Sequence, residues 1–165
     1  MKNTTILMII AAIVFIIILF RKKINTSLGM TRGYRNNNPG NIRKTYDSKG
    51  NQTFWKDEIP GQDKDFKTFK TMADGYRALF ALLKEYKSKG FDTITKIINR
   101  YAPSNENNTN AYINTVVNKT GINPNVPVNL SDTENFKNLV AAISFVENGI
   151  KADENEINKG FNLLS

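Results

Sequence analysis

The sequence lacks two residue types on which much enzyme chemistry depends. Its 165 residues include no cysteine and no histidine. These absences exclude a disulfide framework, a zinc site of the usual Cys/His type, and thiol or imidazole nucleophiles. Acid–base chemistry near neutral pH must therefore come from carboxylates, lysine or tyrosine whose pKa values are displaced by their surroundings. We expect neither a metal site nor a cofactor.

Acidic residues are also fewer than basic ones, 15 against 23, which gives a formal net charge of +8. Four of the basic residues, at position 2 and positions 21–23, flank an apolar run, so the remainder carries only +8 − 4 = +4. A mildly basic surface suits an anionic polymer such as a cell wall, a lipid surface or nucleic acid. It selects none of these, and we expect no specific nucleic-acid partner.

One long apolar run covers residues 6–20, and no charge interrupts it. At a rise of about 1.5 Å per residue it just spans a bilayer core, which predicts a transmembrane helix over 1–24 that contacts lipid through residues 4–20. A cleaved secretory signal is the alternative, but basic residues 21–23 follow the run directly and leave no small-residue cleavage site. The same basic residues favour a cytosolic position for the remainder of the chain.

The rest of the chain is interpreted as a linker, residues 25–33, and one domain, residues 34–165. Residues 34–69 are rich in Asn, Gly, Asp and Lys and show no helical period, which predicts loops with a small β-hairpin. Beyond them, apolar residues recur at helical spacing. The predicted fold class is therefore mainly α, of the α+β type, with a small N-terminal β-hairpin region and one preceding transmembrane helix.

Turn and cap residues set the expected element boundaries. Pro39-Gly40 suits the middle of a type II turn. Residues 131–134, Ser-Asp-Thr-Glu, form a capping-box pattern in which Ser131 caps the helix and Glu134 reaches back. The predicted helices are 72–89, one from Asp92 or Thr93 to before Pro103, one from Asn108 or Thr109 to Gly121, one that begins at the capping box, and a short terminal one with Ile157, Phe161 and Leu164.

Three carboxylates have no obvious structural explanation. Glu147 falls within the apolar stripe of its helix, where burial would raise its pKa and make it a proton donor. Its structural alternative is that the helix end emerges into solvent, with Asn148-Gly149 as a left-handed cap. Glu58 lies beside Trp55, either in a sugar cleft or in a solvated turn. Glu106 follows a proline, either in a substrate site or in a capping or surface-loop role.

Several stretches together resemble phage and prophage virion-associated, lysozyme-like proteins of the lytic transglycosylase type. They are "RGYRNNNPGNIR" (32–43), "FKTFKTMADGYRALFALLKEY" (66–86), "YAPSNENNTNAYINTVV" (101–117) and "AAISFVENG" (141–149). The resemblance covers nearly all of residues 32–165 and implies a lysozyme-like domain that degrades peptidoglycan. Thr109-x-x-Tyr112 also resembles a helix of soluble lytic transglycosylases whose Tyr lines the catalytic cleft.

The order of the parts departs from that family. In lysozyme-like enzymes the helix with the catalytic Glu precedes the β region, whereas here the β part is N-terminal and Glu147 nearly C-terminal. A circular permutation would reconcile the two orders, because chain ends in compact domains often lie close together. The departure also keeps Glu106 as an alternative acid, since it occupies the "EN-x-T" part of the family pattern.

The resulting hypothesis is a membrane-anchored phage enzyme that cleaves peptidoglycan glycan strands while the phage penetrates or lyses the cell. Its single-pass anchor would lie in an internal virion membrane or the host inner membrane, and other virion proteins would be partners. The alternative is a non-catalytic virion membrane protein that retains the fold. A single acid suffices for a transglycosylase. The candidate site residues are catalytic Glu147 and Glu106, and substrate-binding Tyr112, Thr109, Asn38, Asn41 and Glu58.

Overall fold

The computed structural model describes residues 29–104 and 108–164. The chain divides into two units, 1–31 and 32–165, and the second contains the elements that carry the candidate site. The predicted linker, residues 25–33, straddles this division. Glu106 lies outside the described residues.

The predicted membrane anchor has to be corrected. Among residues 29–104 and 108–164, no helix is long and apolar enough to cross a bilayer. This finding removes the transmembrane helix from the fold class and does not support a single-pass membrane localisation. The apolar run on which both predictions depend lies within residues 1–28, outside the described residues.

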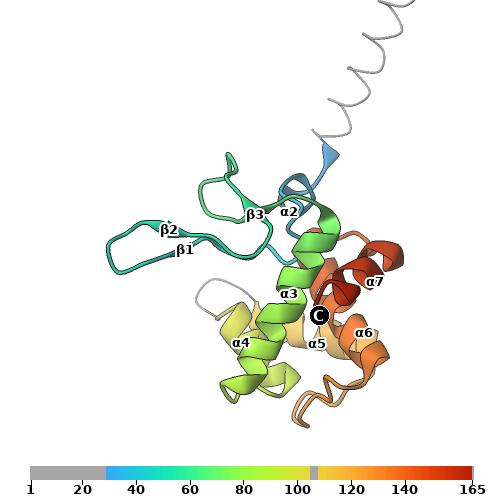
Figure 1. Cartoon of the computed structure of the whole chain (residues 1–165). Helices are drawn as coiled ribbons and strands as arrows, with labels where there is room; N and C mark the ends of the chain where they lie inside the picture. The colour runs from blue at the N-terminus through green and yellow to red at the C-terminus, as the bar shows by residue number, and fades with distance from the viewer. Residues whose placement is uncertain (1–28, 105–107, 165) are drawn as a thin grey trace, which may run out of the picture. The chain divides into compact units, whose positions relative to one another are not determined.

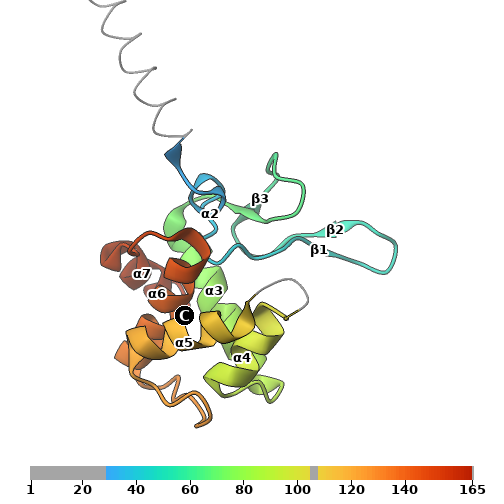
Figure 2. The same ribbon diagram turned by 180° about the vertical axis from the view of Figure 1, so that it is seen from behind.

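The second unit is mainly helical, as predicted, and two small β-hairpins project from the helices (Figures 1 and 2). The helices are α2 (Arg32–Arg35), α3 (Met72–Ser88), α4 (Ile94–Tyr101), α5 (Thr109–Thr120), α6 (Thr133–Asn148) and α7 (Glu154–Asn162). Periodicity in the sequence predicts the five longer ones, and the one-turn helix α2 is too short to show any period.

The β part contains two antiparallel hairpins where the sequence predicts one. Strand β1 (Thr45–Tyr46) pairs with β2 (Gln52–Thr53), and β3 (Glu58–Ile59) pairs with β4 (Thr68–Phe69). Each strand has only two residues, so an alternation of polar and apolar residues cannot predict it. Arg32 of α2 contacts the loop between β3 and β4. Its side chain donates a hydrogen bond to Asp63, with 2.7 Å between Nη2 and Oδ1.

Side-chain caps begin the five longer helices, and left-handed residues end two of them. Asn108 caps α5, and Gly121 and Gly149 adopt φ of 68° at the ends of α5 and α6. The predicted cap of α6 is wrong by one residue, because Asp132 and not Ser131 accepts the hydrogen bond from the Asn135 amide. A carboxylate and a hydroxyl are both good caps, and adjacent ones cannot be ranked by pattern alone.

The core forms where α3 packs against α7 and α5 packs against α6. Phe80 of α3, Phe136 of α6 and Phe161 of α7 meet edge to face, with ring centroids 4.8 Å apart for Phe80 and Phe136. Gly160 allows the close contact of α7 with α3, since a Cβ there would lie 2.6 Å from the Tyr76 Cβ and 2.7 Å from the Ala73 carbonyl oxygen. This core buries one face of α6, which includes Phe136, Leu139 and Ile143.

The Asn-rich segment before β1 does not form the predicted type II turn. Positive φ occurs at Asn37 (50°) and Asn41 (46°), whereas Gly40, which the turn requires in the left-handed region, is not among the residues with positive φ. Gly40 instead permits close packing, because a Cβ there would lie 2.6 Å from the Tyr101 hydroxyl and 3.0 Å from Leu79 Cδ1. The segment is thereby pressed against α3 and α4.

Candidate functional site

Glu147, in the last turn of α6, is the centre of the candidate site. Its Oε1 accepts a hydrogen bond of 2.9 Å from the Tyr112 hydroxyl of α5, and its Oε2 accepts one of 2.9 Å from the Asn41 side-chain amide. Asn41 also donates to the Glu147 carbonyl oxygen at 3.3 Å. Three segments that are distant in the sequence therefore meet at one carboxyl group.

The end of α6 is fixed by the residue after Glu147. Asn148 is buried, and its side-chain amide donates to the Pro39 carbonyl at 2.8 Å and to the Ser144 carbonyl at 3.0 Å. The left-handed Gly149 then ends the helix. This cap belongs to the structural alternative, but the other part of that alternative is not met, because Glu147 is partly buried. Asn148 thus holds the Asn41 segment against the helix that carries the acid.

Burial raises the pKa of the Glu147 carboxyl above its ordinary value. The hydrogen bonds from Asn41 and Tyr112 and the positive charge of Arg43 oppose this shift, but the net direction is upward. Both donors are neutral groups, which stabilise a carboxylate less than a contacting cation does. Burial, together with the nearby Glu147, also raises the pKa of Tyr112 and Tyr101 well above the usual tyrosine value, so both remain protonated.

Glu147 lines a groove of about 690 Å³, which lies among the Asn41–Thr45 segment, the second half of α3 and the end of α4. Asn41 lines it as well. The aromatic and aliphatic side chains in its walls suit the faces of sugar rings. The lining residues are Asn41, Ile42, Arg43, Lys44, Thr45, Trp55, Phe66, Leu82, Glu85, Tyr86, Lys89, Phe91, Arg100, Tyr101, Ala102, Pro103 and Glu147.

Two of the predicted substrate-binding residues make bonds within the protein instead. The buried side-chain amide of Asn38 donates to the carbonyls of Ile42 and Lys67, each at 2.9 Å, and its oxygen accepts from the Ile42 amide at 2.9 Å. Thr109, also buried, donates to the Ala102 carbonyl at 2.7 Å. Neither lines the groove, and both fix the backbone beside it.

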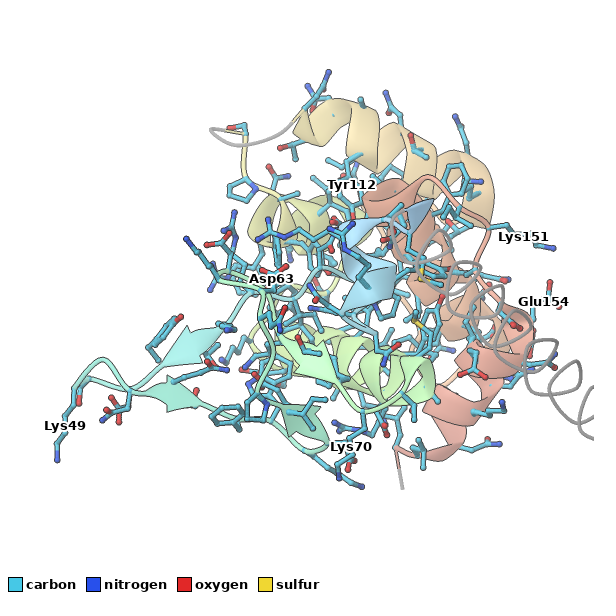
Figure 3. All side chains as sticks on the ribbon, turned by 90° about the horizontal axis from the view of Figure 1, so that it is seen from above. Lys49, Asp63, Lys70, Tyr112, Lys151 and Glu154 are labelled. Carbon is cyan, nitrogen blue, oxygen red and sulfur yellow. The ribbon has the colours of Figure 1, made fainter. Side chains whose placement is uncertain are left out.

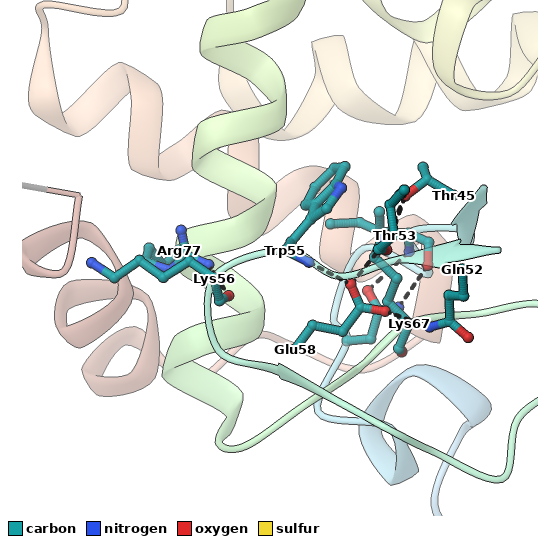
Figure 4. A network of polar contacts seen from close by, with 10 residues as sticks. Thr45, Gln52, Thr53, Trp55, Lys56, Glu58, Lys67 and Arg77 are labelled. Carbon is teal, nitrogen blue, oxygen red and sulfur yellow. Dashed lines mark hydrogen bonds and ion pairs between the residues drawn. The ribbon is translucent and has the colours of Figure 1, made fainter. Parts of the chain in front are cut away.

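Glu58 is enclosed in a network of polar contacts at the base of the β1–β2 hairpin (Figure 4). Its Oε2 lies 2.7 Å from Lys67 Nζ, and neither side chain is exposed at all. The same carboxyl accepts hydrogen bonds of 2.9 Å from the Trp55 amide and from the Gln52 side chain. Lys67 further donates to Thr45 Oγ1 at 3.0 Å and to the Thr53 carbonyl at 3.2 Å. Glu58 is held by these contacts and does not line the groove.

Of the predicted site residues, the structure therefore brings together Glu147, Asn41 and Tyr112. Tyr112 is buried and contacts the acid, and it does not line the groove. It places Asn38, Thr109 and Glu58 in the supporting framework, and Glu106 lies outside the described residues. In residues 29–104 and 108–164, no group of three or more carboxylates is arranged to hold a metal ion.

Sequence reasoning missed the charged and aromatic residues that complete the groove. Arg43 acts on the Glu147 carboxyl through its charge, and Tyr101 donates a hydrogen bond to the Gly40 carbonyl. Arg43 ends the stretch "RGYRNNNPGNIR", two residues after Asn41, and this adjacency was the available signal. Tyr101 begins the stretch "YAPSNENNTNAYINTVV", which was its signal. Arg100 offered none, because only the packing of α4 places it beside the groove.

No family model matches the chain. A 132-residue stretch, 79% of this chain, is 42% identical to protein P5 of Pseudoalteromonas phage PM2 and covers 79% of that protein. This similarity supports the phage part of the predicted resemblance, while its lysozyme-like part stays a prediction. At this identity and coverage, the chain belongs to the family of protein P5 of phage PM2.

Proposed function

We propose that this domain cleaves the glycan strands of peptidoglycan, with Glu147 as the general acid. The observation that carries the proposal is a partly buried carboxyl group of raised pKa in the wall of a groove of about 690 Å³. A carboxyl group that keeps its proton near neutral pH is what protonation of a glycosidic oxygen requires. The relation to a phage protein is consistent with a bacterial cell wall as the target.

The neighbouring groups fit distinct roles in this reaction. Glu147 transfers its proton to the glycosidic oxygen as the bond from that oxygen to the sugar C1 breaks. The carboxylate left behind receives hydrogen bonds from Asn41 and Tyr112, which hold it beside the positively charged sugar. Both donors are fixed by the fold, so little reorganisation is needed at the moment of proton transfer.

The second half of the reaction favours a transglycosylase. The C6 hydroxyl of the same sugar attacks C1 to close an anhydro ring, and its proton passes to Glu147, which restores the acid. This route needs one acid, whereas hydrolysis by the usual two-carboxylate route needs a free partner. Glu85 also lines the groove, but it is engaged with Lys89 at 2.5 Å between Oε1 and Nζ.

The test is the release of soluble muropeptides from purified peptidoglycan by the full-length chain, with mass spectrometry to detect anhydro ends. Glu147→Gln should lower the rate at least about 100-fold, the usual scale for loss of a general acid. Glu134→Gln, an exposed change at the other end of α6, should leave it unchanged.

Three results would overturn the proposal. Release of muropeptides by Glu147→Gln at the wild-type rate would exclude Glu147 as the acid. If Glu106→Gln loses activity while Glu147→Gln keeps it, Glu106 would be the general acid. Binding of peptidoglycan by the wild-type chain without any release would favour the non-catalytic alternative.

A further inference from the structure

The groove around Glu147 is rich in positive charge supplied by three separate elements. Arg43 and Lys44 come from the segment before β1, Lys89 from the end of α3, and Arg100 from α4. Against these four cations the lining contains two carboxylates, Glu85 and Glu147.

Some of these charges have partners within the groove. Glu85 is paired with Lys89, and Glu147 contacts the neutral donors Asn41 and Tyr112. In the part of the chain that the structure describes, neither Lys44 nor Arg100 forms an ion pair with a carboxylate; Arg100 lies 6.0 Å from the centroid of the Tyr86 ring. These cations are available to an anionic group on a ligand.

A neutral sugar polymer gives such charges nothing to bind, whereas a glycan that bears carboxylates does. We infer that the groove selects amino-sugar strands that carry carboxylate groups, with Lys44 and Arg100 as its specificity-determining residues. This inference rests on the proposed function, because it names the feature of the glycan that the same groove recognises. Nucleic acid is the less suitable anion, since the phosphodiester backbone would place charges continuously beside the carboxyl groups of Glu85 and Glu147.

Lys44 and Arg100 are the residues to change, because Arg43 acts on the Glu147 carboxyl and its loss would also alter the acid. The test measures binding by the full-length Glu147→Gln protein, which keeps the groove while removing the acid. One ligand is soluble peptidoglycan strands. The second is the same strands after their carboxylates have been converted to neutral amides with ethanolamine. Neutral chitin oligosaccharides are the third.

Native strands should bind roughly tenfold more tightly than the amidated strands or chitin, because only the native strands carry anions that Lys44 and Arg100 can contact. Adding Lys44→Gln and Arg100→Gln should abolish this preference. Adding Lys49→Gln should preserve it, because Lys49 lies at the tip of the β1–β2 hairpin, away from Tyr112 (Figure 3). Raising the salt above physiological strength, where the screening length is about 8 Å, should also weaken the preference.

Equal affinity for native and amidated strands would overturn the inference. Tighter binding of a 20-nucleotide DNA than of native strands, lost in the Lys44→Gln/Arg100→Gln variant, would overturn it in favour of a nucleic-acid surface. Failure of the proposed function is distinguishable from these outcomes. A wild-type protein that releases no muropeptides but prefers native strands refutes catalysis and leaves the charge selection intact.

Discussion

Two carboxyl groups of this domain are removed from water in different ways. Glu58 is fully enclosed and has a cation, Lys67, at 2.7 Å. Glu147 is only partly buried and is contacted by two neutral donors, Tyr112 and Asn41. A buried charge is tolerated when it is paired, whereas burial with neutral donors alone favours the protonated form. The partners of each carboxyl group therefore suit Glu58 to structure and Glu147 to proton transfer.

The role of Glu58 predicts the effect of removing its cation. Lys67→Met should lower the free energy of unfolding by about 3–5 kcal/mol, because the Glu58 carboxylate would remain buried without a counter-charge. The double variant Lys67→Met/Glu58→Leu should recover most of this loss, since no charge is then buried. Urea unfolding followed by circular dichroism measures both. A loss of less than about 1 kcal/mol in the single variant would contradict an enclosed ion pair.

At the scale of elements, apolar periodicity is sufficient to predict the longer helices, because each buries one face against the core. The exact cap of α6 could not be predicted, since Ser131 and Asp132 are adjacent and only the backbone geometry selects Asp132. The two hairpins could not be predicted from the sequence pattern either, because strands of two residues are too short to show a period. The spacing of apolar residues reflects burial over several residues, whereas the cap of α6 and the two hairpins depend on single contacts.

The same difference explains how much of the site could be predicted. Glu147 stands out because it interrupts an apolar stripe. Asn41 lies 106 residues away from it, and only the resemblance pointed to Asn41. Asn38 was a candidate as one of the Asn side chains of "NNNPGN", and Glu58 because Trp55 beside it could line a sugar cleft. Their partners, the Ile42 backbone and Lys67, become evident only when the chain is folded.

Gly160 tests whether a local preference or a packing contact decides the stability of α7. Helix propensity alone predicts that Gly160→Ala stabilises the protein by about 1 kcal/mol. The contact with α3 predicts the reverse, a loss of about 1–3 kcal/mol, because the new Cβ would meet Tyr76 and the Ala73 backbone. Thermal unfolding measures the sign. Asn158→Ala, an exposed change on the same helix, is the control and should be neutral or slightly stabilising.

At the scale of the whole domain, the candidate site imposes a cost that the rest of the fold must offset. The chain places a carboxyl group in the last turn of α6, where the partial negative charge of the helix end disfavours an anion. It also buries that group enough to raise its pKa. Functional sites commonly reduce stability in this way, and the aromatic core around Phe80, Phe136 and Phe161 provides a compensating gain.

Glu147→Gln should therefore stabilise the domain at pH 7, by an amount on the order of 1 kcal/mol. The folded-state pKa of Glu147 lies above the ordinary value of 4.5, so the wild-type protein loses stability as the pH rises from about 4.5 through the folded-state pKa. Below that window the carboxyl group is protonated in both states, and the advantage of the variant should vanish. Urea unfolding from pH 4 to pH 8 measures this dependence.

Glu134→Gln, on the first turn of the same helix, is the control. It should lower the free energy of unfolding at pH 7, because an anion is favoured at that end of the helix. A variant Glu147→Gln that is equally stable or less stable than wild type across this range would show that the carboxyl group is well solvated, and the case for a proton-holding acid would fail with it.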